Sequence, residues 1–168
     1  NFIPEVSEAM SAQTAYTMLN LMQGVVDGAY SDHFDKKLGT GVRLRFKYGF
    51  KNEIAAKTGT TQNNSDGWFI GLTPELVTGV WVGAEDRAVR FRSMTYGQGA
   101  RMALPIYGYY MEKVYKDPKI ALSRLDFMRP ADYDSLSYDC IEIQTPEQYR
   151  LNQQQKTLFN DSLVPFIF

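Results

Sequence analysis

Four consecutive residues, Lys57, Thr58, Gly59 and Thr60, bring an ammonium group, two hydroxyls and a bare backbone position together. If they lie on a strand, alternation puts Thr58 and Thr60 on the same side, where two hydroxyls can hold one anionic group. Lys57 supplies positive charge, and the missing side chain at Gly59 lets a ligand lie against the backbone. The Thr60 amide can donate to a developing oxyanion. These residues therefore predict one wall of a site for an anionic substrate.

A Lys-Thr-Gly sequence is weak support by itself. Lysine on an edge strand commonly serves as a solvated guard against aggregation, and Lys57 fits that interpretation as well. A phosphate-binding loop is disfavoured, because Ala56 stands where such a loop has glycine before its lysine. The elements around Lys57 must therefore decide what it does.

Three strand-like segments follow one another around this motif. Glu53 to Thr61 contains the first, Trp68 to Leu72 is the second and Val77 to Gly83 is the third. The connections Gln62 to Gly67 and Thr73 to Glu75 have the composition of tight turns. Short links between consecutive strands predict an antiparallel meander.

One helix is expected before the strands in the sequence and one after them. Apolar residues at helical spacing predict a helix that Ser11 caps and Gly28 ends. Pro105 is suited to the first turn of a second helix, and the segment Ala29 to Gly41 is expected to be a loop. Together these elements predict an α/β fold of the α+β type, an antiparallel sheet with packing helices.

Composition excludes several classes of protein. The 168 residues are 44% hydrophobic and 22% charged, which is typical of a folded chain. A net charge of -1 gives no global field for nucleic acid, so no nucleic-acid partner is expected. The single cysteine, Cys140, and the single histidine, His33, cannot build a zinc site together, so no metal is predicted. No apolar run approaches the ~20 residues of a membrane span, so any membrane attachment is expected through a missing anchor.

A local basic stretch runs from Lys36 to Lys51. It fits a solvated face whose charge is offset by Asp32, Asp35 and Glu53. The functional interpretation is contact with an anionic wall polymer or a partner. The sequence leaves both open.

The motif and the run after it resemble the class A, bifunctional penicillin-binding proteins. From Asp66 the chain reads DGWFIGLTP and from Leu76 it reads LVTGVWVG, similar to the family's D-x-WF-x-G-x-TP-x-L-x-x-x-VWVG after its KTGTT. The helix from Thr14 to Val26 and the segment from Gly99 to Ile106 resemble the flanking helices. The resemblance covers about Ser7 to Lys113.

One departure from the family is clear. Such enzymes combine S-x-x-K, S-x-N and K-T-G, but none of the nine serines here has Lys three positions later or Asn two positions later. In the family both elements precede K-T-G. We therefore expect residues 1–117 to be the C-terminal portion of a transpeptidase domain, followed by a tail at 118–168. The chain alone is expected to be unable to acylate.

The resemblance implies a D,D-transpeptidase in the parent protein, which cross-links peptidoglycan stem peptides through a serine acyl-enzyme and binds β-lactams. It assigns Lys57 a catalytic role, Thr58 and Thr60 to the substrate carboxylate, the Thr60 amide to the oxyanion hole and Gly59 to an open strand wall. No metal or organic cofactor is implied. The implied location is the periplasmic face of the bacterial inner membrane, through the parent's anchor, with a glycosyltransferase domain upstream.

Two alternatives stay open. A β-lactamase-like hydrolase or carboxypeptidase of the same superfamily would use water where a transpeptidase uses an amine. A non-catalytic interaction module could keep the strand as a scaffold. Whichever applies, a partial sheet leaves apolar surface uncovered, so we expect self-association or pairing with the upstream part of the protein.

Overall fold

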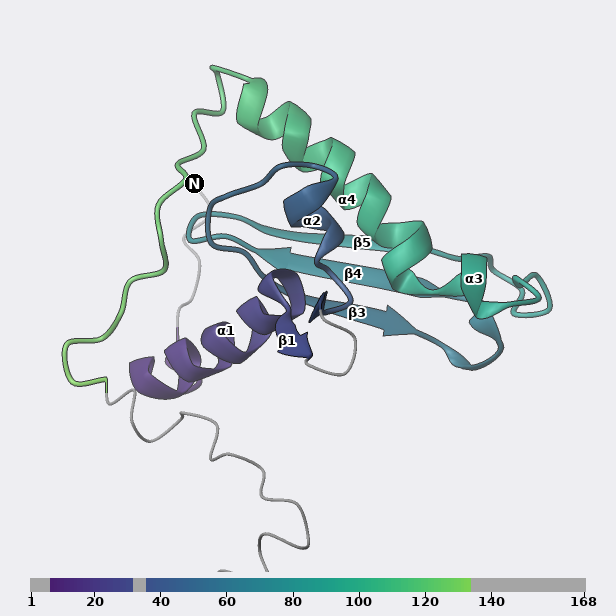
Figure 1. The fold of residues 1–168 in the computed structure, drawn as a ribbon, viewed down its shortest axis with the longest axis horizontal. Coiled ribbons are helices and arrows are strands. Elements are labelled where there is room, and N and C mark those ends of the chain that lie inside the picture. Colours follow the sequence, from purple (N-terminus) through teal and green to yellow (C-terminus); the bar gives the residue numbers. More distant parts are fainter. Residues whose placement is uncertain (1–6, 32–35, 134–168) are drawn as a thin grey trace, which may run out of the picture. The chain divides into compact units, whose positions relative to one another are not determined.

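A computed structural model of the chain describes residues 7–31 and 36–133. The predictions made for His33, Cys140 and the end of the tail lie outside these residues. The described elements, in chain order, are α1 (Ala12–Asp27), β1 (Ala29–Ser31), β2 (Lys36–Leu38), α2 (Arg43–Phe46), β3 (Ala55–Thr60), the 3₁₀ turn η1 (Gln62–Asn64), β4 (Gly67–Leu72), β5 (Val77–Val82), α3 (Met94–Gly97) and α4 (Gly99–Lys116) (Figure 1).

The three predicted strands form an antiparallel sheet in the order β3-β4-β5. Its register places Lys57 opposite Ile70, and Gly59 opposite Trp68, which in turn lies opposite Trp81. Directly opposed residues of an antiparallel pair share a sheet face. Lys57 and both tryptophans therefore lie on one face, and Thr58 and Thr60 lie on the other.

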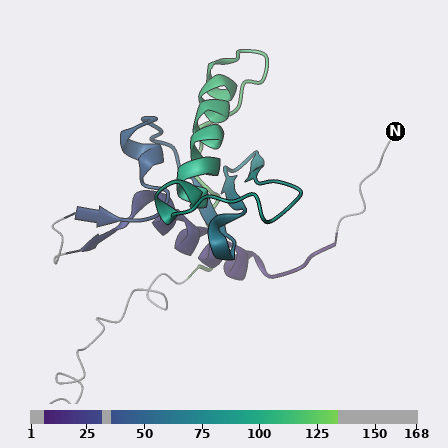
Figure 2. The same ribbon diagram turned by 90° about the vertical axis from the view of Figure 1, so that its right-hand side faces the viewer.

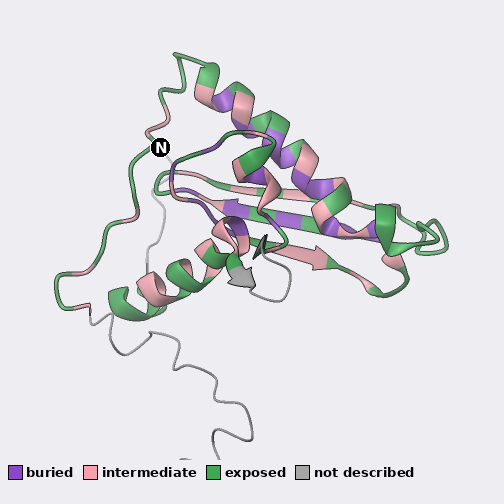
Figure 3. Ribbon diagram, in the orientation of Figure 1, coloured by how far each residue is buried: buried purple, intermediate pink, exposed green. Residues whose placement is uncertain are grey.

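Helix α4 covers the face that carries Thr58 and Thr60. Figure 3 shows the buried residues concentrated on α4 and β4, where Phe69 and Tyr107 are fully buried with ring centroids 4.8 Å apart. Gly71 of β4 has no side chain where the Tyr107 ring packs, and a Cβ there would collide with the ring. Antiparallel strands and packing helices confirm the predicted α/β class.

The boundaries of α1 are those that the sequence predicts. Ser11 accepts a hydrogen bond from the Thr14 N–H with its hydroxyl, as an N-cap does. Gly28 ends the helix with a φ of 73°, and its N–H donates to the carbonyl of Gly24. Helix α1 packs against β3 and so supports the strand that carries Lys57.

The prediction of a loop from Ala29 to Gly41 is wrong at two places. Strands β1 and β2 pair antiparallel there, with Ala29 opposite Leu38, and in Figure 2 they extend away from the other elements. Ala29, Lys37 and Leu38 are all exposed, with Leu38 at 41%. These short strands lack the apolar alternation by which a strand is recognised in a sequence.

The second helix starts earlier than predicted. Helix α4 begins at Gly99, so Pro105 lies inside it and not in its first turn. Proline inside a helix removes one backbone hydrogen bond, and that cost makes an interior position hard to predict. Burial of Ala103, Leu104 and Tyr107 around the proline stabilises the helix against the sheet.

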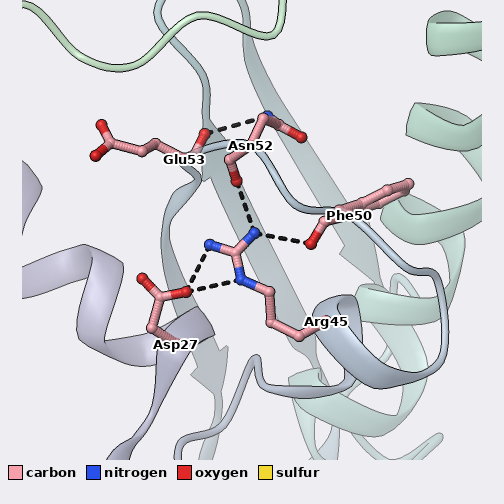
Figure 4. A network of polar contacts seen from close by, with 5 residues as sticks. All are labelled: Asp27, Arg45, Phe50, Asn52 and Glu53. Carbon is pink, nitrogen blue, oxygen red and sulfur yellow. Dashed lines mark hydrogen bonds and ion pairs between the residues drawn. The ribbon is translucent and has the colours of Figure 1, made fainter.

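Two arginines of the basic stretch, Arg43 and Arg45, bind other parts of the fold. The Arg45 guanidinium lies 2.6 Å from the Asp27 carboxylate of α1 and donates to the carbonyls of Phe50 and Asn52 at 2.9 and 2.6 Å (Figure 4). Arg43 donates to the carbonyl of Ala100 at 3.2 Å. The Arg45 network joins α1 and α2 to the segment that enters β3, so it positions the Lys57 strand.

The described part of the predicted tail, residues 118–133, is attached to the fold. The Ser123 N–H donates to the Glu75 carboxylate, and the Phe127 N–H donates to the Glu53 carboxylate, both at 2.8 Å. Near its end, the Gln13 side chain of α1 donates to the Asp132 carboxylate at 2.6 Å. This segment, green in Figure 1, therefore runs from α4 back to α1.

Among the described residues no helix has the length and apolar character that crossing a membrane requires.

Candidate functional site

Strand β3 has one edge without a strand neighbour among the described residues. At its end, the Thr61 N–H donates to the Asp66 carbonyl at 3.0 Å, across the pairing with β4. Backbone N–H groups alternate in direction along a strand, so the Thr60 N–H points away from β4. A backbone donor is therefore available at the unpaired edge, where the sequence predicts one.

The Lys57 ammonium lies at the same edge. Its side chain is exposed, and Nζ donates to the Thr58 carbonyl at 2.8 Å. By the same alternation the Thr58 carbonyl also points away from β4. The structure thus brings the Lys57 ammonium and the Thr60 N–H to one side of β3.

The two hydroxyls predicted to act together do share a face, and each has a neighbour. Thr58 is half-buried and its Oγ1 donates to Thr40 Oγ1 at 3.1 Å. Thr60 is exposed and its Oγ1 accepts a hydrogen bond from the Gly99 N–H at 3.0 Å. The sequence does not predict Thr40 or Gly99 as a partner of these hydroxyls, because contacts between distant segments leave no spacing pattern.

Gly59 gives room to a neighbouring side chain. A Cβ at Gly59 would lie 3.0 Å from the Trp68 Cβ and 3.7 Å from its ring. Trp68 pairs with Trp81 at a centroid distance of 6.4 Å, and the two remain 44% and 48% exposed. We call the exposed apolar residues of this side the tryptophan face; they are Trp68, Ile70, Val77 and Trp81. The wall beside Gly59 is therefore backbone bordered by an indole.

A carboxylate fixes the turn that follows Thr60. Asp66 accepts hydrogen bonds from Ser65 Oγ at 2.8 Å, Thr61 Oγ1 at 3.1 Å and Trp81 Nε1 at 3.2 Å. The bond from Ser65 is the main cause of a lowered pKa at Asp66, with smaller contributions from Thr61 and Trp81 and an opposing effect of desolvation. Asp66 thus joins the turn after β3 to the third strand. Asp66 is part of the sequence motif, but the motif does not reveal that its carboxylate binds Ser65, Thr61 and Trp81.

No cluster of three or more His, Cys, Asp or Glu side chains able to hold a metal ion occurs within residues 7–31 and 36–133.

Comparisons with known proteins point to a single family. Penicillin-binding protein 1A of Pseudomonas aeruginosa is 37% identical over 118 residues, which are 69% of this chain and 12% of that protein. Penicillin-binding protein 1B of Escherichia coli strain K12 is 34% identical over 136 residues, 81% of this chain and 14% of that protein. No family model matches the chain.

The fold has a solved counterpart. The crystal structure of penicillin-binding protein 1A from Haemophilus influenzae superposes with a TM-score of 0.58 at 26% identity. The match covers 73% of this chain and 17% of that one. The chain therefore spans a small part of the length of each relative.

Proposed function

Because the chain belongs to the class A penicillin-binding proteins, we propose that it supplies one wall of a D,D-transpeptidase site that cross-links peptidoglycan stem peptides. The observation that supports this most is the unpaired edge of β3, where the Lys57 ammonium lies beside the strand. The Thr60 N–H points to the same side. Acyl transfer needs a cation and a backbone N–H donor beside the bound substrate, and the edge of β3 offers both.

The reaction that we propose takes place in the whole protein. A serine outside this chain attacks the carbonyl carbon of the penultimate D-Ala, its Oγ–C bond forms, and the terminal D-Ala leaves as an amine that takes up a proton. An amine of a neighbouring stem peptide then attacks the ester. The new amide bond forms as the Oγ–C bond breaks, and the serine regains its proton. Since its serines lack the S-x-x-K and S-x-N patterns, the chain alone is expected to be inactive.

Each residue of the Lys-Thr-Gly-Thr motif on β3 has a separate role in this reaction. Lys57 supplies positive charge and helps to move the proton of the attacking serine. The hydroxyls of Thr58 and Thr60 hold the terminal carboxylate of the stem peptide or of a β-lactam. The Thr60 N–H forms half of the oxyanion hole, and loss of one such donor costs about 3 kcal/mol in comparable enzymes. Gly59 keeps backbone accessible beside the Trp68 ring.

The partner that completes the wall is the upstream part of the same protein. The tryptophan face is an apolar surface on the side of the sheet opposite α4, and such surfaces are covered in a finished domain. We propose that the whole protein works at the periplasmic face of the bacterial inner membrane. A membrane anchor and a glycosyltransferase domain upstream belong to the same proposal.

The test uses the full-length parent protein and a fluorescent penicillin. Lys57→Ala is expected to slow acylation at least ~100-fold, the usual contribution of a positioned proton-transfer group. Lys113→Ala, at an exposed lysine of α4, is the matched control and should acylate normally. Unchanged acylation of Lys57→Ala would remove Lys57 from the mechanism.

A second readout separates the proposed activity from hydrolysis. Parent protein supplied with a pentapeptide donor and an amine acceptor should give mainly the cross-linked product. A predominance of the hydrolysed tetrapeptide would favour the carboxypeptidase alternative. A parent that neither acylates nor cross-links would leave the non-catalytic module.

A further inference from the structure

Two hollows lie side by side where the turn after β3 meets the loop between β5 and α3. The first, the apolar hollow, has a volume of about 320 Å³ and is lined by Val82, Ala84 and Met102, among others. The second, the polar hollow, has a volume of about 700 Å³ and is lined by Asn63, Asn64 and Arg92, among others. Both volumes fall within the ~300–1,000 Å³ typical of sites for small ligands.

One short segment forms a wall of both hollows. Val89, Arg90 and Phe91 line each of them, so the Arg90 side chain stands between an apolar and a polar compartment. Phe91 is fixed there, because its N–H donates to the Asn64 carbonyl at 3.3 Å. A ligand that fills both hollows must therefore pass along residues 89–91.

The hollows are formed by close backbone packing. Gly97 of α3 lies so near Asn64 that a Cβ at Gly97 would collide with the asparagine side chain. Asn63 and Asn64 both have positive φ, 62° and 58°, a conformation that asparagine tolerates better than most residues. Asn63 and Asn64, which line the polar hollow, thus lie in a tight turn that packs against α3.

Arginine side chains line both hollows, Arg90 each of them and Arg92 the polar one. Among the described residues, neither Arg90 nor Arg92 takes part in an ion pair, and both are exposed. Arg87 lies near Asp66, whose pKa it helps to lower. Asp86 uses its carboxylate to accept the Ala88 N–H at 2.8 Å. Two guanidinium groups are thus free to bind an anion.

We propose that the two hollows bind a short peptide that has an apolar side chain and a free carboxylate. The apolar side chain fits the hollow lined by Val82 and Met102. The carboxylate pairs with Arg90, since guanidinium and carboxylate groups match in geometry. The amide side chains of Asn63 and Asn64 offer donors and acceptors to the peptide backbone, which a hydrocarbon chain would not use. This site is separate from the edge of β3 and does not depend on the transpeptidase proposal.

The probe is N-acetyl-Leu-Ala, built of L residues, with a free carboxylate or as its carboxamide. Nitrogen–proton correlation spectra of the 168-residue chain are recorded during titration with each form. The acid should give saturable shifts at the amides of Asn64, Ala84 and Phe91. The carboxamide should bind about five- to tenfold more weakly, because one charge-assisted contact is lost at a partly exposed site.

Arg90→Gln is the diagnostic variant. It should lower the affinity for the acid to that for the carboxamide and leave the affinity for the carboxamide unchanged. Arg101→Gln removes an exposed arginine of α4 that lines neither hollow, so it should change neither affinity. Because the acid is compared with the carboxamide on the unmodified chain, the test does not depend on any variant folding.

Three results would overturn the proposal. The first is equal affinity of the unmodified chain for the acid and the carboxamide. The second is a lack of saturation at millimolar concentration. The third is octanoate binding as tightly as the acid, which would make the occupant a fatty anion. Penicillin acylation of the parent reads the edge of β3, so its failure would be a separate result.

Discussion

The backbone N–H of Gly99 donates a hydrogen bond to the Thr60 hydroxyl at 3.0 Å, and so the start of α4 is fixed to the end of β3. Gly99 is packed so closely that a Cβ there would collide with the carbonyl oxygens of Gly59 and Trp68. The helix that closes the core thus meets the two strands at backbone level. The position of Thr60 depends on this contact.

Gly99→Ala should therefore lower the free energy of unfolding by about 1–3 kcal/mol, since backbone must move to admit the methyl group. Gly79→Ala is the matched control. A Cβ at Gly79 would have its nearest neighbour at 3.9 Å, so that variant should stay within ~0.5 kcal/mol of the parent chain. Urea unfolding measures both. Equal effects of the two substitutions would contradict the packing argument.

Tyr107→Phe should raise the free energy of unfolding by about 1 kcal/mol. The Tyr107 hydroxyl is buried and has no hydrogen-bond partner among the described residues, and burial raises its pKa. Removing an unsatisfied buried hydroxyl recovers its desolvation cost. Tyr115→Phe is the opposite case, because the Tyr115 hydroxyl accepts a bond from Asn52 at 2.8 Å and its loss should destabilise the chain. Thermal unfolding measures the stability of both variants. If both substitutions changed the stability in the same direction, the prediction would be wrong.

Acid should weaken the fold through Asp66. Its folded pKa lies below the unfolded value of about 3.9, so its contribution to stability is present above that value. The contribution is lost as the pH falls through the unfolded and then the folded pKa. Asp66→Asn should be less stable at pH 7 and show a shallower loss of stability on acidification. The measurement is urea unfolding from pH 7 to about pH 3.

Glu85→Gln serves as the control for Asp66, because Glu85 is exposed and has no hydrogen bond among the described residues. It should leave the stability at pH 7 close to that of the parent chain. A parallel pH profile for the parent chain and Asp66→Asn would mean that Asp66 does not carry the effect.

The tryptophan face should make the isolated chain self-associate. Ile70 and Trp81 are 39% and 48% exposed on one face of the sheet, and exposed apolar surface drives association. The double variant Ile70→Lys and Trp81→Lys should shift the molar mass measured by light scattering toward the monomer. Tyr110→Lys, on the outer side of α4 and 45% exposed, should not. If light scattering showed the unmodified chain to be monomeric at high concentration, the prediction would be refuted.

Sequence reasoning located the elements that leave a local pattern. Ser11 and Gly28 delimit α1 by their side-chain and backbone chemistry, and alternation with short turns defines β3, β4 and β5. The same reasoning missed the β1–β2 pair, in which Ala29, Lys37 and Leu38 are exposed. It also placed the start of α4 at Pro105, because the burial that tolerates proline inside the helix comes from a distant sheet.

The site was predicted in part for the same reason. Lys57, Thr58, Gly59 and Thr60 are adjacent, so alternation alone fixes which of them share a face. The ties that hold them are distant in sequence: Thr40 bonds Thr58, and Gly99 bonds Thr60. Arg45 likewise binds Asp27 and the segment that enters β3. A basic stretch in the sequence does not reveal which of its arginines form such contacts and which are solvated.

Lys57 and the tryptophans occupy the same side of one sheet, opposite Ile70 and beside Gly59. Any polypeptide that shields the indoles from water must therefore approach the ammonium in the same step. Under the proposed function, covering the tryptophan face and completing the site around Lys57 are then a single event.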